Sequence, residues 1–283
     1  MVYLTATFIL AAPDRSIVGY GPPGRLLLVF DMTTHLNNSV SATLDTAEVE
    51  RFNALAQQWW DPHGNFRPLH QIGPARLEFI RDTIVAELSP AAPSKLRLLA
   101  GVRLLDIGCG GGLVAEPLAR LGCKVTAIDP AADTIAAAQA HAGGQGLDID
   151  YRATRAEALV EAGETFDVVL CLEVVEHVPD VRAFLKVVGA LVRPGGLLVL
   201  STINRTLKSY ALAIIGAEYV LRWLPASTHQ WDRFLTPTEL ADHTVAIGLQ
   251  PLPPRGIVFN PFEDSWSLSA DTGVNYMMAA RRP

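Results

Sequence analysis

Five short apolar runs, separated by segments of helical character, dominate the middle of the chain. The segments between the runs, such as LVAEPLARLG and VRAFLKVVGALV, carry apolar residues at the spacing of an α-helix. Short apolar runs are typical of strands buried on both faces of a parallel sheet. The alternation therefore predicts an α/β fold with a doubly wound, mostly parallel sheet, whose ligands bind at the carboxyl ends of the strands. The runs lie at 102–107, 124–128, 149–152, 167–172 and 196–202.

Two helices are predicted before the first strand, so the domain extends over residues 45–283. The first helix covers 45–61, because Asp45 is a candidate N-cap and apolar residues recur at helical spacing until Pro62. The second covers 74–88, where apolar periodicity resumes after a stretch rich in proline and glycine.

The chain before the first helix has a different character. Residues 1–44 contain several prolines and glycines and no sustained periodicity, which predicts a flexible extension. Its apolar run lacks the preceding basic residues of an export signal, and a polar stretch typical of a protein start begins at Met32. We interpret the part before Met32 as an extension or a misassigned start, and we assign no function to it.

Composition narrows the class of protein. A chain of 283 residues with 49% hydrophobic and 18% charged residues can bury a large core. Its net charge of −6 disfavours nucleic acid as a partner. The three cysteines form no C-x-x-C pair, which argues against a disulfide framework or a structural zinc site and fits the reducing cytoplasm. No run of eighteen apolar residues is present, so we expect no membrane-spanning helix.

A glycine-rich stretch, LLDIGCGGG, follows directly from the first predicted strand. Gly108 and Gly110 allow a tight turn and a close approach of the backbone to a ligand, and the next helix offers free N–H groups to an anion. The spacing D-x-G-x-G-x-G from Asp106 differs from the dinucleotide fingerprint, which needs glycine at Leu113. Asp106 would repel a pyrophosphate and attract an ammonium group. Close packing of helix against strand is the alternative explanation of the glycines.

Asp129 ends the second predicted strand, beside the glycine turn in a doubly wound fold. A carboxylate at this position can accept hydrogen bonds from both hydroxyls of a ribose. The alternative is an acidic residue at the start of the following helix. Taken together with Asp106 and the glycines, the ribose interpretation is favoured, and a ligand with an ammonium group, a carboxylate and a ribose is S-adenosylmethionine.

The stretch CLEVVEHVPD, after the fourth predicted strand, suggests chemistry. Glu173, Glu176 and His177 have the i, i+3, i+4 spacing that would place them on one side of a helical turn. Such a cluster suits a divalent cation, Mg²⁺ or Mn²⁺ in preference to Zn²⁺. Capping of the turn or shaping of a substrate pocket is the alternative, and His177 is also a candidate general base.

The segment after the fifth predicted strand is unusually apolar. Residues 204–225 combine many aliphatic and aromatic residues with three basic ones, Arg205, Lys208 and Arg222. This composition suits a helix lying in the plane of a membrane, with its basic residues toward anionic head groups. A core-packed helix pair or a lid over the site is the alternative. Trp59 and Trp60 also have two interpretations: they are core residues, or they line the entrance to an aromatic site.

Four motifs resemble those of class I S-adenosylmethionine-dependent methyltransferases, in order and spacing: DIGCGGG, VTAIDP, FDVVLCLEVVEHVPD and LVRPGGLLVLSTINR. The flanks resemble the ubiquinone biosynthesis O-methyltransferases, through residues 52–76, 201–231 and 273–282. The resemblance extends from Thr46 to the C-terminus and is weakest over 254–271.

The resemblance implies a seven-stranded, Rossmann-like sheet with a helical insertion over 204–231. It implies that a divalent cation, Mg²⁺, binds the 173–177 cluster, and that His177 and Glu173 are catalytic. The residues that match the family's cofactor-binding positions are Arg76, Gly108, Asp129 and Leu172, to which the glycine loop adds Asp106 and Gly110.

The same resemblance implies O-methylation of hydroxyl groups on polyprenylated catechol and demethylubiquinol intermediates of ubiquinone biosynthesis. It implies a cytoplasmic enzyme, peripherally bound to the inner membrane through 204–225 and associated with other enzymes of the pathway. Two alternatives are a methyltransferase for another small acceptor and a non-catalytic, membrane-docking protein that binds S-adenosylmethionine. A nicotinamide-dependent dehydrogenase is disfavoured by Asp106 and by the glycine spacing.

Overall fold

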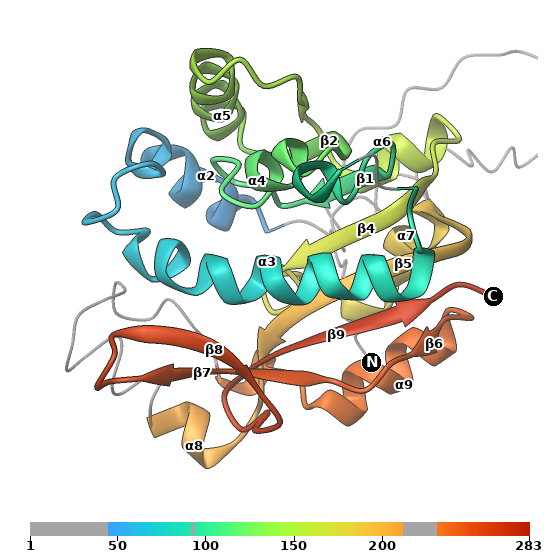
Figure 1. Cartoon of the computed structure of the whole chain (residues 1–283). Helices are drawn as coiled ribbons and strands as arrows, with labels where there is room; N and C mark the ends of the chain where they lie inside the picture. The colour runs from blue at the N-terminus through green and yellow to red at the C-terminus, as the bar shows by residue number, and fades with distance from the viewer. Residues whose placement is uncertain (1–44, 92–93, 212–230) are drawn as a thin grey trace, which may run out of the picture.

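The computed structural model describes residues 45–91, 94–211 and 231–283 (Figure 1). Each of the five predicted apolar runs forms a strand, and these five strands pair in parallel. They occupy one half of a single sheet in the order β3-β2-β1-β4-β5. Their bounds are β1 Arg103–Ile107, β2 Lys124–Asp129, β3 Asp150–Ala153, β4 Phe166–Leu172 and β5 Val192–Ile203. The predicted mixed α/β fold with a mostly parallel core is therefore confirmed.

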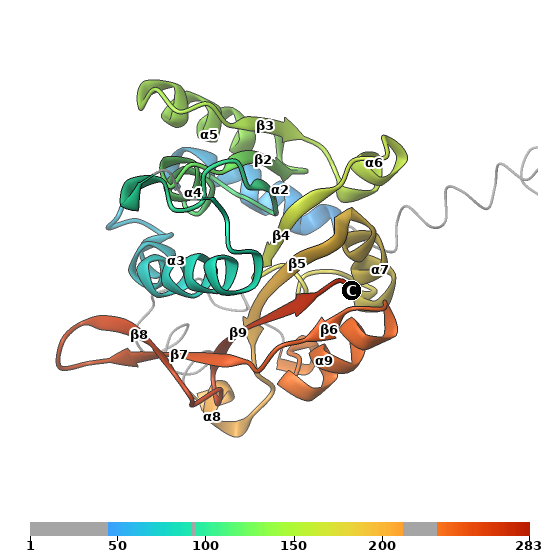
Figure 2. The same cartoon turned by 45° about the vertical axis from the view of Figure 1, so that its right-hand side comes forward.

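Alternation along the strands sends side chains into two separate cores. Leu104 and Val168 belong to one core, while their neighbours Leu105 and Val169 belong to the other. This is the two-residue period of a sheet that is covered on both faces. Figure 2 shows the helices on the two sides of the sheet. One side carries α3 Arg67–Leu88, α4 Ala115–Arg120 and α5 Ala132–Gly144, and the other α6 Ala156–Glu161, α7 Val181–Leu191 and α9 Pro237–Ala246.

The second half of the sheet is antiparallel. It contains β6 Gln250–Pro251, β7 Arg255–Asn260, β8 Ser265–Ser269 and β9 Asn275–Arg281. The described part of the sheet has nine strands, where the family resemblance implied seven. The difference arises because β7 folds back on β8 as a hairpin and because the two residues of β6 pair with β9. The hairpin lies in the stretch where the resemblance was weakest.

The N-terminal helices differ from the prediction. The first, α2 Thr46–Ala54, is shorter and is followed by a 3₁₀ turn, η1 Ala56–Gln58. The second, α3, begins at Arg67, so the predicted start at Pro74 is wrong. A proline inside a helix removes one hydrogen bond, but α3 buries apolar side chains on both sides of it, including Ile72 and Phe79. Burial of this face outweighs the local cost of the proline.

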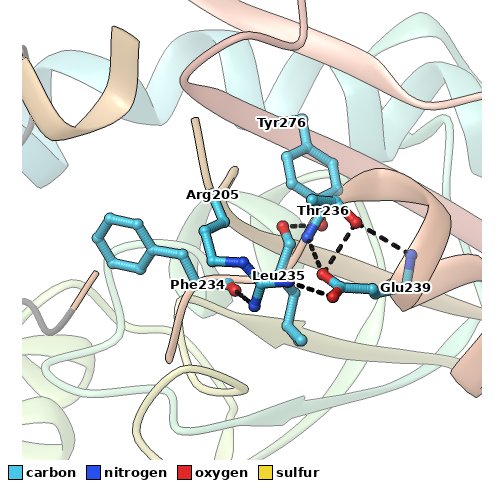
Figure 3. Close-up of polar contacts among 6 residues, drawn as sticks. All are labelled: Arg205, Phe234, Leu235, Thr236, Glu239 and Tyr276. Atoms are coloured by element: carbon cyan, nitrogen blue, oxygen red, sulfur yellow. Dashed lines mark hydrogen bonds and ion pairs between the residues drawn. The ribbon is translucent and has the colours of Figure 1, made fainter. Parts of the chain in front are cut away.

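The two ends of the predicted insertion are tied together (Figure 3). Arg205 donates a hydrogen bond to the carbonyl oxygen of Phe234 at 2.9 Å and forms an ion pair with Glu239. The Tyr276 hydroxyl, from β9, donates to the carbonyl oxygen of Leu235 at 2.9 Å. The segment therefore leaves β5 and returns to α9 at one place against the sheet.

Three predictions fall wholly or mainly on residues outside the described ranges. One is the flexible extension over 1–44. The others are the helical insertion over 204–231 and the membrane-facing segment over 204–225, of which only residues 204–211 and 231 are described. These include the short helix α8 Leu207–Ser209. In the described part of the chain, each helix is too short or too polar to cross a membrane.

Candidate functional site

The glycine loop, residues 108–112, connects β1 to α4 at the carboxyl edge of the sheet. Gly108, Gly110 and Gly112 have φ angles of 70°, 52° and 88°, which favour glycine strongly. A Cβ atom on Gly110 would lie 2.3 Å from the indole of Trp59, and one on Gly108 would lie 2.6 Å from Val174. The glycines are thus required by side chains from neighbouring loops, whereas the alternative interpretation assigned them to packing of the helix against its strand.

Asp129 holds this loop in place. Its carboxylate accepts a hydrogen bond from the N–H of Gly110 at 3.1 Å and another from the N–H of Ala131 at 2.9 Å. Burial raises the pKa of Asp129, and the two backbone donors act in the opposite direction. The side chain therefore lies beside the loop, as the ribose interpretation needs, and also contacts the backbone just before α5, as the alternative proposed.

Asp106 is a buried carboxyl group without full compensation. It lies in β1, and its Oδ2 atom has no hydrogen-bond partner among the described residues. Burial raises the pKa of Asp106 to about 7, repulsion from Asp129 adds to the shift, and the positive charge of Arg76 opposes it. A bound cation at this position would satisfy the free oxygen and stabilise the ionised carboxylate.

Arg76 reaches the same edge of the sheet from α3. Only 6% of its surface is exposed, and its Nη2 atom lies 2.8 Å from Oε1 of Glu173. The same oxygen accepts a hydrogen bond from the hydroxyl of Ser201 at 2.8 Å. The Nε–H group of Arg76 has no partner among the described residues. The guanidinium therefore keeps a donor available for an anionic ligand group, next to the residues that end β4.

The turn after β4 differs from the predicted helical turn. Leu172 is buried at the end of the strand, and Glu173 follows with a left-handed φ of 54°. His177 closes a turn through its N–H to the carbonyl oxygen of Val174 at 2.9 Å, and α7 does not begin until Val181. The expectation that three side chains project from one turn of helix is wrong. A left-handed residue other than glycine is strained, and such strain is concentrated at functional sites.

Glu176 is nevertheless brought next to Glu173. It is buried, and its Oε2 atom accepts a hydrogen bond from the hydroxyl of Thr202 at 3.0 Å. Burial, followed by repulsion from Glu173, raises the pKa of Glu176 well above its usual value. Within the described ranges, no three His, Cys, Asp or Glu side chains form a group arranged to hold a metal ion.

Two tryptophans contact the glycine loop, and this contact was not predicted from the sequence. The Trp59 ring stacks on Phe66 at a centroid distance of 3.8 Å and covers Gly110 and Gly111. The Trp60 indole N–H donates to the carbonyl oxygen of Gly111 at 2.9 Å. Trp59 is buried, as the core interpretation expected. No spacing rule connects these residues with a loop that lies about fifty positions later in the chain.

A surface pocket lies just beyond Asp129, at the carboxyl ends of β2 and β3. It is lined by Pro130 and by residues between Ala153 and Glu161. The general prediction of ligands at the carboxyl ends of the strands covers this edge, but the residues of α6 that line the pocket were not predicted. One of its lining residues, Pro130, directly follows Asp129 in the chain.

Two of the three cysteines lie at the site, and all three are buried and free. Cys109 is in the glycine loop and Cys171 comes two residues before Glu173. Burial raises the pKa of both thiols well above the usual value. Cys123 lies away from the loop, and burial raises its pKa to about 12.

The chain matches a family model described as a methyltransferase domain over residues 74–252. It is 53% identical to the ubiquinone biosynthesis O-methyltransferase of Azorhizobium caulinodans over 86% of this chain and 96% of that protein. It is also 53% identical to the enzyme of the same name from Brucella anthropi, over 88% of this chain and 100% of that protein. The chain belongs to the ubiquinone biosynthesis O-methyltransferase family. The resemblance inferred from the four motifs is therefore confirmed.

Solved structures agree with this family's fold. Magnesium protoporphyrin IX methyltransferase from Synechocystis PCC 6803 with bound SAH is 19% identical, with a TM-score of 0.57, and the match covers 89% of this chain and 100% of that chain. The plantazolicin methyltransferase BamL is 14% identical, with a TM-score of 0.59, over 84% and 99% of the two chains. At such low identity, the similarity supports the Rossmann-like class I methyltransferase fold.

Proposed function

We propose that this protein transfers the methyl group of S-adenosylmethionine to hydroxyl groups of polyprenylated catechol and demethylubiquinol intermediates of ubiquinone biosynthesis. The observation that carries the proposal is the buried carboxyl group of Asp106, which directly precedes the glycine loop, has an Oδ2 atom without a hydrogen-bond partner among the described residues, and is acted on by the charge of Arg76. At this edge, the Asp106 carboxylate can bind an ammonium group and the Arg76 guanidinium can bind a carboxylate. Together they match the two charged groups of an amino acid.

The remaining contacts of the cofactor follow along the same edge. Asp106 would face the ammonium group and the free Nε–H of Arg76 the carboxylate. Gly108 and Gly110 would give the backbone access, and Asp129 would accept hydrogen bonds from the ribose. The pocket beyond Pro130 suits the adenine base, and Leu172 would contribute an apolar contact.

The placement of the ammonium group beside Asp106 predicts that cofactor binding releases a proton. With a pKa of about 7, about half of the Asp106 side chains are protonated at neutral pH. A neighbouring positive charge favours the ionised form, so binding should release up to about half a proton per cofactor. Titration calorimetry in buffers of different ionisation enthalpy measures this number.

The control is Asp106→Asn, in which the release should disappear. The variant should also change stability in the absence of cofactor. Because folding raises the pKa of Asp106 from 3.8 to about 7, its contribution to the free energy of unfolding is present below the lower value and is lost as pH rises through the higher one. Thermal unfolding of Asp106→Asn at several pH values should not show this fall in stability as pH rises. Proton release that persists in the variant would contradict the placement of the ammonium group beside Asp106.

The chemistry requires a phenol to become a nucleophile. An unperturbed phenol has a pKa of about 10, so a base or a cation must stabilise the phenolate. The phenolate oxygen then forms a bond to the methyl carbon as the bond from that carbon to the sulfonium sulfur breaks, leaving S-adenosylhomocysteine. Glu173 and His177 lie after the central strand β4, where they would orient the acceptor and take its proton.

We also propose that Mg²⁺ binds to Glu173, Glu176 and His177. The adjacent carboxyl groups suit a hard cation, which would displace the proton that burial favours on Glu176. When bound, the cation would supply stabilisation of the phenolate. Glu173 is paired with Arg76, and the described residues contain no three-ligand group arranged to hold a metal, so metal binding requires these side chains to adjust.

We propose that the protein associates with a membrane, on the basis of residues 204–211, the described start of the insertion. Leu207 is 83% exposed and Tyr210 is 45% exposed, next to Lys208, whose half-exposed side chain forms an ion pair with Asp271. An exposed apolar pair beside a cation suits the surface of an anionic bilayer, where a polyprenylated substrate resides. We propose that the enzyme works in the cytoplasm, bound peripherally to the inner membrane and associated with other enzymes of the pathway.

The decisive experiment is transfer of a labelled methyl group from S-adenosylmethionine to a short-chain demethylubiquinol presented in anionic vesicles. We expect transfer that stops with a chelator and returns with Mg²⁺, and enzyme that sediments with the vesicles. Transfer that is insensitive to the chelator would retain the methyltransferase, overturn the metal proposal and leave His177 as the base. Tight cofactor binding without transfer would overturn the proposed acceptor.

A further inference from the structure

Three side chains connect the cap, defined here as residues 56–66, to α5 and α4. The Trp60 indole stacks on the imidazole of His141, in α5, at a centroid distance of 3.5 Å and an interplanar angle of 10°. The Nδ1 atom of His141 lies 2.6 Å from Oε1 of Glu116, in the first turn of α4. We call these three residues, Trp60, His141 and Glu116, the latch. α2 and η1 both contact α5, and Figure 1 shows where α2 and α5 lie in the fold.

Glu116 anchors the latch from inside the protein. Its side chain is fully buried, and its second carboxylate oxygen accepts a hydrogen bond from Arg120 at 3.2 Å. A buried carboxylate needs donors on both oxygens, and here His141 and Arg120 supply them. The side chain of His141 is only 29% exposed. Its orientation is determined by the contact with Glu116 on one side and by the stacked Trp60 indole on the other.

Both ends of the latch are hydrogen-bonded to the glycine loop. Trp60 donates to the carbonyl oxygen of Gly111 at 2.9 Å, and the backbone N–H of Glu116 donates to the carbonyl oxygen of Gly112 at 3.0 Å. The peptide between Gly111 and Gly112 is also held on its other side, because the N–H of Gly112 donates to the carbonyl oxygen of Cys109 at 3.0 Å. Both hydrogen-bonding groups of that peptide are thereby fixed in direction.

We propose that Trp60, His141 and Glu116 are positioning residues, which hold the glycine loop and the overlying cap in the geometry that binds S-adenosylmethionine. The inference rests on the proposed placement of the cofactor at the loop. None of the three residues reaches Glu173 or Glu176 in the described contacts, so the latch acts on cofactor affinity and leaves the methyl-transfer step unchanged.

The separate contacts can be removed one at a time. Trp60→Phe keeps an aromatic face for His141 but lacks the N–H donor to Gly111. His141→Phe keeps a face for Trp60 but leaves Glu116 with one donor fewer, and His141→Gln keeps a donor but loses the stack. His63 is an exposed histidine of the same cap, so His63→Phe is the matched control.

The test measures affinity for S-adenosylhomocysteine by calorimetry, together with KM for S-adenosylmethionine and kcat at saturation. We expect Trp60→Phe and His141→Phe to weaken binding and raise KM by about tenfold, the effect of one lost contact in a rigid site. We expect kcat at saturation to stay within about twofold of wild type, since only binding is affected. His141→Gln should fall between these variants and wild type, and His63→Phe should equal wild type.

Hydrogen exchange supplies a readout that general destabilisation would not produce. In the absence of cofactor, the amides of residues 108–116 should exchange faster in the latch variants, while those of β9 should not change. Wild-type affinity and wild-type exchange in both Trp60→Phe and His141→Phe would overturn the proposal, as would a fall in kcat with unchanged KM. If Gly110→Ala binds S-adenosylhomocysteine as well as wild type does, the proposed placement of the cofactor is wrong. If Gly110→Ala loses binding and the latch variants do not, only the positioning role of the latch is wrong.

Discussion

Gly110→Ala is expected to weaken binding of S-adenosylmethionine by about a hundredfold or more, since overpacking and left-handed strain act together at this position. The added Cβ would lie 2.3, 2.6 and 2.8 Å from three atoms of the Trp59 ring, on a residue with a φ of 52°. Trp59 is buried and stacked on Phe66, so it cannot yield without moving the cap. Calorimetric titration with S-adenosylhomocysteine measures the loss.

Gly146→Ala is the matched control for this variant. Gly146 has a similar φ of 65°, but a Cβ there would meet no atom within 4 Å. It should therefore lower the free energy of unfolding by about 1 kcal/mol through backbone strain and leave cofactor affinity unchanged. Equal affinities in the two variants would show that contact of the loop with Trp59 is irrelevant to binding.

Glu173→Gln is expected to reduce kcat by about a hundredfold to a thousandfold, the range for loss of a charged group that acts in the transition state. The substitution removes the negative charge that pairs with Arg76 and that accepts from Ser201. It also removes one carboxylate of the proposed cation site. Steady-state methyl transfer with saturating cofactor and added Mg²⁺ measures the effect, and a wild-type kcat would exclude a catalytic role for Glu173.

Glu176→Gln separates charge from shape at the neighbouring position. Burial and Glu173 raise the pKa of Glu176, so the side chain is neutral in the folded protein over a pH range in which the unfolded chain is ionised. Its contribution to stability is therefore greatest at acidic pH and is lost as pH rises above 4.5 toward the folded pKa. Glutamine resembles the protonated acid, so we expect an unfolding temperature at neutral pH no lower than wild type. A large drop in that temperature would show that Glu176 is ionised when folded.

Much of the fold was predictable from local patterns. Buried parallel strands appear in the sequence as short apolar runs, so β1 to β5 were located within a few residues. The proximity of Asp129 to Gly110 followed from topology, because adjacent parallel strands bring their carboxyl ends to the same edge. In both cases the determining information lies within one element or in the order of elements.

The features that were not predicted depend on contacts between distant residues. The left-handed backbone at Glu173 overrides the helical spacing of the residues after it, because its N–H continues the pairing with β5 through the carbonyl oxygen of Ser201. Burial of α3 against the sheet tolerates Pro74 inside the helix. The stacking of Trp60 on His141 joins residues that are about eighty positions apart, which no periodicity encodes.

The buried cysteines have a consequence for an enzyme that handles quinols. Oxidation of such a substrate yields a quinone, an electrophile that alkylates thiolates by conjugate addition. Only the thiolate is strongly nucleophilic, and burial raises the pKa of Cys109, Cys123 and Cys171. Burial therefore disfavours the thiolate form of the two cysteines nearest the site, which lowers their reactivity toward the oxidised form of a quinol.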